Sequence, residues 1–301
     1  MCACPNIGWV KFITIVSFVE IFVFILELLL KPKGVQHNNE FLEADNSVMD
    51  ELGWQDARKI KHKGQIWRWF TPILLHGNFE HLMGNLVAQI YMGTGIENGI
   101  STKYMAVLYI ISGFGGNLLS SVLNPTSYGV GASTAVFGLV GFYTQYFFTH
   151  FTYMGYDQPN SWTKRPWCQR VFLFIFVILI VILNLNQGAY AGEQTDNRVD
   201  NYAHLGGLVT GIFAGIAICE WLDQEAKNNG RAPDRFTSMR AYEGRIGCNN
   251  WFCHFCGTLT LTAWLVTLIM VFYLYVEVDD EEYYDNIEVN PTPPPSNDVR
   301  P

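Results

Sequence analysis

The chain has 301 residues, of which 50% are hydrophobic and only 15% are charged. Its apolar residues lie in long blocks, a distribution that excludes an ordinary soluble domain and indicates a polytopic membrane protein. The formal net charge is −8, much of it in one acidic tail, so no nucleic-acid partner is expected.

Seven stretches are long and apolar enough to cross a membrane as helices. They cover residues 12–30, 82–100, 103–123, 131–149, 170–188, 203–222 and 257–276. The first exceeds the apolar core of a secretory signal and has no small-residue cleavage site after Leu30, so we expect it to be retained. We therefore predict an all-α membrane helix bundle forming a single domain over residues 1–276. The acidic, proline-rich residues 277–301 are expected to be a disordered tail.

The connection between the first two stretches contains residues 47–70, SVMDELGWQDARKIKHKGQIWRWF. Its mixture of tryptophan, apolar and charged residues is typical of an interfacial helix lying on the bilayer, and a solvent-exposed linker is the alternative. Lysine and arginine in the short later connections favour a cytosolic N-terminus, although this long loop is also basic and opposes it.

Polar residues stand near the start of three predicted helices. His81 and Asn85 lie four residues apart in HGNFEHLMGN, Ser133 follows Gly131 in GASTAVFGLVGF, and His204 stands in AHLGGLVTG. With a cytosolic N-terminus these helices run in the same direction, so the polar groups share one depth. Because such groups are costly in hydrocarbon, together they indicate a water-accessible functional cavity.

Serine is a poor nucleophile until an adjacent base accepts its proton, and His204 is the candidate base for Ser133. Gly207 and Gly211 form a face of small residues that allows a neighbouring helix to approach closely. Phe137 lies one turn after Ser133 and could stack on the imidazole. Neither helix places an acidic residue to orient that ring, so we predict a dyad in place of a Ser-His-Asp triad.

An oxyanion site is the third requirement of acyl transfer, because negative charge builds on the carbonyl oxygen in the transition state. His81 and Asn85 project from one helix face and can both donate hydrogen bonds, as can the backbone N–H of Ser133. The alternative is that these residues, with His76, only satisfy one another across helix contacts.

These motifs resemble those of the rhomboid intramembrane proteases, whose pattern includes WR in the first loop, H-x4-HxxxN, GxSx followed by an aromatic residue, and AHxxGxxxG. The likeness spans about residues 65–222. The matching positions are Trp67, Arg68, His76, His81, Asn85, Glu97, Gly131, Ser133, Phe137, Gly141, Ala203, His204, Gly207 and Gly211.

The resemblance implies a six-helix core followed by one extra C-terminal helix, as in the eukaryotic secretory-pathway type. It also implies a Ser133–His204 dyad, an oxyanion site using His81 and Asn85, and peptide hydrolysis through an acyl-enzyme with no metal or organic cofactor. The implied partners are single-span membrane proteins and the bilayer, and the implied location is the plasma membrane, Golgi or another endomembrane. Thr134 departs from the glycine that many members carry there, and its branched side chain could crowd the oxyanion region.

Two other functions stay open: a rhomboid-like pseudoprotease that binds membrane clients without cutting them, and a transporter. A transporter or channel would use His81, Asn85 and His204 as a proton or substrate path, but that function leaves the serine and its glycine setting unexplained. Glu20 and Glu27, on one face of the first helix, could also relay protons, although hydrogen bonding within the bundle or a place near the interface is the more common role for such carboxylates. The cluster Cys248, Cys253, His254 and Cys256 lacks the paired spacing of a zinc site, so no metal is expected.

Overall fold

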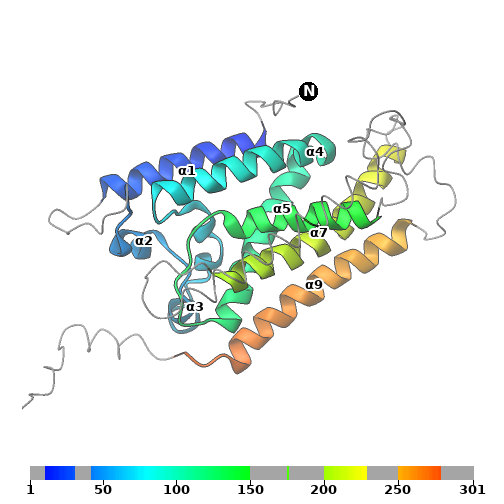
Figure 1. Cartoon of the computed structure of the whole chain (residues 1–301). Helices are drawn as coiled ribbons and strands as arrows, with labels where there is room; N and C mark the ends of the chain where they lie inside the picture. The colour runs from blue at the N-terminus through cyan, green and yellow to red at the C-terminus, as the bar shows by residue number, and fades with distance from the viewer. Residues whose placement is uncertain (1–10, 31–41, 150–174, 176–199, 229–249, 279–301) are drawn as a thin grey trace, which may run out of the picture.

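The computed structural model describes residues 11–30, 42–149, 175, 200–228 and 250–278. Within these residues the chain forms helices and connecting loops, and its β-type pairing is limited to two isolated bridges, Glu43 to Asn78 and Gln55 to Gly129. The predicted all-α bundle is therefore confirmed for the described part of the chain (Figure 1).

The long helix α4, Phe79–Leu123, contains two of the predicted spans. They are separated at Ser101, whose φ of 76° and ψ of 157° are not helical. The first part of α4 lies beside α1, Phe12–Leu29, and the second part turns away from it (Figure 1). A chain reversal at one residue thus replaces the short loop that the sequence suggested between residues 100 and 103.

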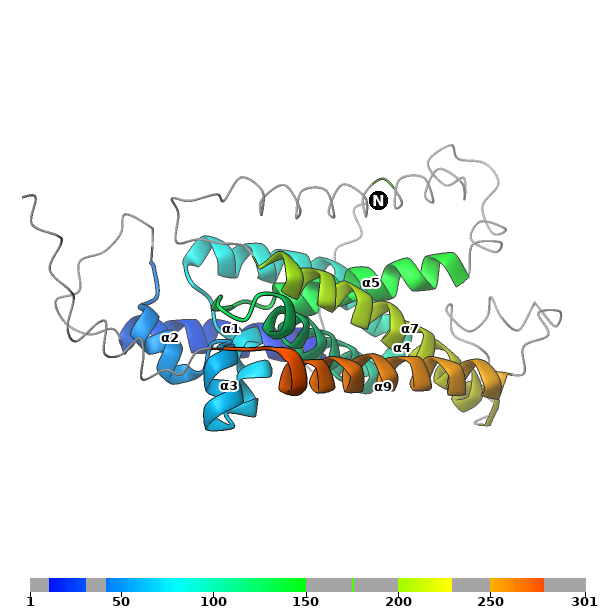
Figure 2. The same cartoon turned by 90° about the horizontal axis from the view of Figure 1, so that it is seen from below.

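Helix α7, Asn201–Asn228, occupies the centre of the bundle and contacts α4, α5 and α9. Helix α5, Ser133–Thr149, packs against it on one side. Helix α9, Asn250–Tyr275, packs against another side, and its orange ribbon runs beside α7 in both overall views (Figures 1 and 2). The Trp264 indole N–H on α9 donates to the Thr210 hydroxyl on α7 at 3.0 Å.

Among the described residues, four helical segments are long and apolar enough to cross a membrane: Phe12–Leu29, Ile100–Leu123, Asn201–Ile218 and Phe255–Tyr275. They agree with four predicted spans. The spans predicted at 82–100 and 131–149 are also helical, but α5 has only 17 residues, near the lower limit for crossing the hydrocarbon core. The span predicted at 170–188 lies outside the described residues, apart from residue 175.

The loop before α4 is not the single interfacial helix that its composition suggested. It contains α2, Asn46–Leu52, and α3, Ala57–Lys63, followed by the 3-10 turns η1, Ile66–Trp69, and η2, Thr71–Leu74. Asp45 and Asp56 accept backbone N–H groups at the starts of α2 and α3, and glycines with positive φ end both helices. These local caps and stops favour short helices over one long helix.

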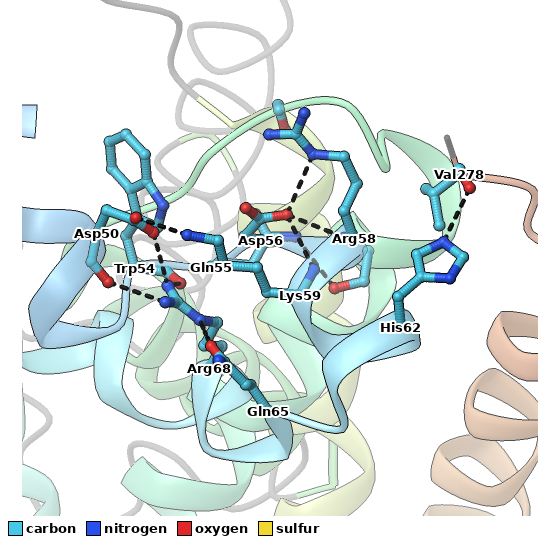
Figure 3. A network of polar contacts seen from close by, with 12 residues as sticks. Asp50, Trp54, Gln55, Asp56, Arg58, Lys59, His62, Gln65, Arg68 and Val278 are labelled. Atoms are coloured by element: carbon cyan, nitrogen blue, oxygen red, sulfur yellow. Dashed lines mark hydrogen bonds and ion pairs between the residues drawn. The ribbon is translucent and has the colours of Figure 1, made fainter. Parts of the chain in front are cut away.

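Arg68 holds this loop together from inside (Figure 3). Its guanidinium, 5% exposed, donates to the backbone oxygens of Trp54 and Asp50 at 3.0 and 2.9 Å and to the Gln65 side chain at 2.6 Å. It also lies 3.2 Å from the Asp50 carboxylate. The loop is therefore a folded unit built on a buried, fully engaged arginine.

Candidate active site

The hydroxyl of Ser133 and the imidazole of His204 are in direct contact. Ser133 is the first residue of α5 and His204 is the fourth residue of α7. The Ser133 Oγ atom lies 2.7 Å from His204 Nε2, within the range for proton transfer from a nucleophile to a general base. The predicted contact is present, and both side chains are half-buried and not sealed in the core.

Close packing of α5 on α7 makes this contact possible. A Cβ added at Gly207 would lie 2.1 Å from the backbone oxygen of Thr134, and one at Gly211 would lie 2.0 Å from the backbone oxygen of Gly138. Only glycine at these positions allows the two backbones to approach so closely. The small-residue face read from the sequence is therefore the surface on which α7 meets the serine helix.

The ring of Phe137 stacks on the ring of His204. Their centroids are 4.3 Å apart and their planes differ by 9°. This is the arrangement expected from the one-turn spacing between Phe137 and Ser133. It fixes the plane of the imidazole while leaving the Nε2 edge toward Ser133.

His81 and Asn85 lie over the turn that leads into α5. Gly131 has a φ of +119°, and a Cβ there would lie 2.7 Å from His81 Nε2 and 3.5 Å from Asn85 Nδ2. Asn85 is 7% exposed, and its buried Nδ2 atom has no hydrogen-bond acceptor among the residues that the structure describes. Ser133 begins its helix, so its N–H has no acceptor within that helix.

A buried amide donor without a hydrogen-bond partner lowers the stability of the folded protein by about 1–3 kcal/mol, so such groups are rare and are often functional. The Nδ2 group of Asn85, 3.5 Å from the Cβ position of Gly131, can donate to an oxygen near the start of α5. The three predicted donor groups, from His81, Asn85 and the Ser133 backbone, therefore converge on the same end of the bundle.

Thr134, next to Ser133, packs its side chain between helices. Its side chain is 4% exposed and faces α4, where its Cβ is 3.0 Å from the position a Cβ would take on Gly116. Because the glycine leaves room for the branched side chain, Thr134 packs at the contact between α5 and α4.

His76 lies next to the donor pair, with its ring centroid 5.3 Å from that of His81. Its ring is fully buried. Burial, with a smaller contribution from His81, lowers the pKa of His76 to about 3. The ring is therefore neutral at physiological pH, while its backbone N–H donates to the Glu27 carboxylate at 3.3 Å.

Other matching positions lie away from the dyad. Trp67 is 51% exposed beside the buried Arg68 in η1. Glu97 accepts the backbone N–H groups of Phe12 and Ile13 at 2.7 and 3.1 Å, and so holds the start of α1. These residues support the scaffold and do not touch Ser133 or His204 through any described hydrogen bond.

The carboxylate of Glu20 is also tied into the bundle. Tyr109 donates to it at 2.9 Å and Gln89 at 2.6 Å. This is the hydrogen-bonding role that the sequence left as the alternative to a proton path. Cys248 lies outside the described residues, and no group of three or more metal-binding side chains occurs within the described ranges.

Sequence reasoning missed Asp200, which directly precedes α7. Its Oδ1 atom accepts the Ala203 N–H at 3.0 Å, and Ser120 Oγ donates to its Oδ2 atom. An aspartate three residues before a helical alanine is a recognisable N-cap signal. The pairing with Ser120, 80 residues earlier, has no sequence signal.

Comparison with known proteins gives a consistent result. The family model of the Rhomboid domain matches residues 63–221. RHOMBOID-like protein 1 of Arabidopsis thaliana is 32% identical over 178 residues, 59% of this chain and 41% of that protein. RHOMBOID-like protein 4 of the same plant is 30% identical over 211 residues, 68% and 48% of the two chains. Rhomboid-like protease 2 of Toxoplasma gondii is 30% identical over 226 residues, 74% and 69%. The chain spans about half the length of the Arabidopsis relatives it matches.

Proposed function

The chain belongs to the rhomboid family, and from that premise we propose that it is an intramembrane serine endopeptidase with Ser133 as nucleophile and His204 as general base. The observation that carries the proposal is the 2.7 Å separation of Ser133 Oγ and His204 Nε2. Relatives whose names include "rhomboid-like protease" add support at the level of the family.

The proposed reaction begins when Ser133 Oγ attacks the carbonyl carbon of the scissile peptide and its proton passes to His204 Nε2. The negative charge that forms on the carbonyl oxygen is stabilised by Asn85 Nδ2, the His81 ring and the Ser133 N–H. Collapse of this intermediate transfers the proton from His204 to the leaving amine and leaves an acyl-enzyme. His204 then takes a proton from the water that attacks the ester carbonyl and returns it to Ser133 Oγ as the acyl group leaves as a carboxylic acid, so the steps require no metal or organic cofactor.

Phe137 supports this chemistry by holding the His204 ring. A triad would need an acidic side chain on the far edge of that ring, whereas the hydrogen bonds described for Asp200 go to Ser120 and to the α7 backbone. Stacking of Phe137 at 4.3 Å restricts the plane of the His204 imidazole. We therefore keep the dyad as the proposed catalytic unit.

We propose single-span membrane proteins as substrates, cut in or near their transmembrane segments. The proposed enzyme sits in the plasma membrane or an endomembrane such as the Golgi, with its N-terminus in the cytosol. Residues 1–276 form the proposed membrane domain, with the core at about 65–222, one further helix at about 257–276, and an acidic tail at 277–301.

A pseudoprotease or a transporter with the same fold is less well supported. A protein that only binds clients has no need for a serine hydroxyl held 2.7 Å from an imidazole. A transporter with a path through His81, Asn85 and His204 leaves the contact between the Ser133 hydroxyl and His204 unexplained. The carboxylates of Glu20 and Glu27, a second possible proton relay, accept hydrogen bonds within the bundle.

The test is cleavage of a labelled single-span substrate by the purified full-length protein in liposomes. Wild type should cut it, and Ser133→Ala and His204→Ala should each be inactive. Ser127→Ala is the matched control, because this serine lies in the loop before α5 and donates to Asn124 O at 3.1 Å. Cleavage that persists in Ser133→Ala would overturn the nucleophile, and an uncut substrate with wild type would favour a client-binding role.

A further inference from the structure

The carboxylate of Asp200 joins the start of α7 to the end of α4. Its Oδ1 atom caps α7 by accepting the Ala203 N–H at 3.0 Å, while its Oδ2 atom accepts the hydroxyl of Ser120. Its backbone oxygen accepts the N–H of His204 at 3.2 Å. The residue four positions before the proposed base therefore has a side chain fixed to another helix.

The neighbouring serine on α4 makes the complementary connection to the first loop. Ser121 Oγ accepts the Gln55 side-chain amide and the Trp69 indole N–H, both at 3.0 Å. Ser120 and Ser121 are both fully buried. The end of α4 is thus a junction that binds α7 on one side and the loop on the other.

The segment leading to Ser133 meets the same junction. The backbones of Gln55 and Gly129 form two hydrogen bonds. The Gln55 N–H donates to the Gly129 oxygen with an N–O distance of 2.9 Å, and the Gly129 N–H donates to the Gln55 oxygen with an N–O distance of 3.2 Å. A Cβ on Gly129 would lie 3.7 Å from Asp200 Oδ2. The carboxylate of Asp200 therefore lies where the start of α7 and the approach to α5 come together.

Burying a carboxylate is unfavourable unless its hydrogen bonds compensate. Burial raises the pKa of the Asp200 carboxyl above its ordinary value, and the hydrogen bonds from Ser120, Ala203 and Tyr202 act in the opposite direction. A solvent-exposed cap would satisfy α7 without this cost. The buried position needs a reason beyond capping.

We propose that Asp200 is a positioning residue for His204, holding the start of α7 against Ser120 so that the imidazole stays in reach of the Ser133 hydroxyl. This inference rests on the proposed protease function. Because Asp200 and His204 are four residues apart, they lie one turn apart on the same face. Loss of the bond between Asp200 and Ser120 would let the start of α7 shift, and His204 would shift with it.

Four variants test this role in the liposome cleavage assay, each with kcat, KM and the thermal unfolding midpoint. Asp200→Ala removes both bonds and should lower kcat by about 30-fold or more with KM within about twofold, since small misplacements are costly in catalysis. Asp200→Asn keeps a capping oxygen and a partner for Ser120, so it should stay within about fivefold of wild type. Ser120→Ala keeps the cap but loses the tether and should show an intermediate loss of kcat.

Asp56→Ala is the matched control. Asp56 is also a buried capping aspartate, 2% exposed, but it caps α3, which carries no proposed catalytic residue. It should lower the unfolding midpoint and leave kcat unchanged. A loss of kcat in Asp200→Ala and Ser120→Ala but not in Asp56→Ala separates positioning from general destabilisation.

Three results would overturn the inference: an Asp200→Ala protein with wild-type kcat, an effect confined to KM, or an Asp200→Asn protein as inactive as Asp200→Ala. If the alanine variant does not fold, Ser120→Ala decides alone, and an unchanged kcat there rejects the tether. Ser133→Ala is measured in parallel. If it still cuts, the protease assignment fails, whereas an inactive Ser133→Ala beside a fully active Asp200→Ala rejects only the role of Asp200.

Discussion

Replacing Gly211 with alanine should push α7 away from α5 and slow cleavage. The added Cβ would lie 2.0 Å from the backbone oxygen of Gly138, whereas ordinary contacts begin at 3.4 Å. Because the obstacle is backbone and not a flexible side chain, the helices must separate locally by about 1.4 Å. Gly211 lies two turns after His204 on the same face, so this displacement acts directly on the dyad.

The size of the effect follows from the Ser133–His204 distance. If the dyad opens by the same amount, 2.7 Å becomes about 4 Å, beyond hydrogen-bond reach. A misplacement of about 1 Å can cost about 100-fold in rate, so kcat should fall by about that factor or more. The unfolding midpoint should also fall, because overpacking typically costs about 1–3 kcal/mol.

The assay is liposome cleavage with kcat and KM determined separately, alongside thermal unfolding. Gly95→Ala is the matched control: Gly95 is an exposed glycine of α4, and a Cβ there would meet nothing within 4 Å. Its kcat should equal that of wild type. A Gly211→Ala protein with wild-type kcat and stability would refute the claim that the α5–α7 approach sets the dyad distance.

Three further outcomes are expected. Asn85→Ala should lower kcat by about 100-fold with little change in KM, because its donor acts in the transition state; an effect on KM alone would remove Asn85 from the oxyanion site. Phe137→Ala should lower kcat by about tenfold and Phe137→Tyr should restore it, since an aromatic ring 4.3 Å from His204 orients the imidazole; equal activity of both variants would contradict the stacking role. The pKa of His76 is lowered from 6.5 to about 3 in the folded protein, so the unfolded chain binds a proton at this histidine more readily. The free energy of unfolding therefore falls as the pH drops from 6.5 toward 3, by at most about 1.4 kcal/mol per pH unit. The unfolding midpoint of His76→Asn should therefore decline less steeply than that of wild type between pH 6.5 and 4, and identical slopes would argue against a buried neutral imidazole.

The contact between Ser133 and His204 could be anticipated from polar residues near the starts of two apolar helices and from the resemblance to the rhomboid proteases, whereas the place of Phe137 follows from helix periodicity. Ser133 begins an apolar helix, Phe137 stands one turn later, and the glycine face after His204 indicates a close helix neighbour. Periodicity assigns residues to a face of a helix. It also identified a face on which two backbones meet.

Periodicity does not say which neighbour a side chain meets, and the remaining features depend on that. Thr134 packs against α4 because Gly116, on that helix, leaves room for it. Asp200 matters because it reaches Ser120, and a pairing over 80 residues leaves no local pattern. The break in α4 at Ser101 is likewise not marked by a proline in the sequence.

The loop before α4 shows a different limit. Its composition suggested one interfacial helix, but Asp45 and Asp56 start short helices and Gly53 and Gly64 end them. Caps and stops outweighed overall amphipathic composition in this segment. Reading the capping residues first would have predicted the break between α2 and α3.

The most direct measurement of the central claim is the site and rate of labelling by a fluorophosphonate, which reacts with a serine only when a base activates it. Peptide mass spectrometry of the labelled full-length protein in liposomes should place the adduct on Ser133. Labelling should fall by about 100-fold or more in His204→Ala and stay unchanged in His62→Ala, a histidine on the exposed surface of α3. An adduct on another residue, or labelling of Ser133 that proceeds equally fast without His204, would contradict the dyad.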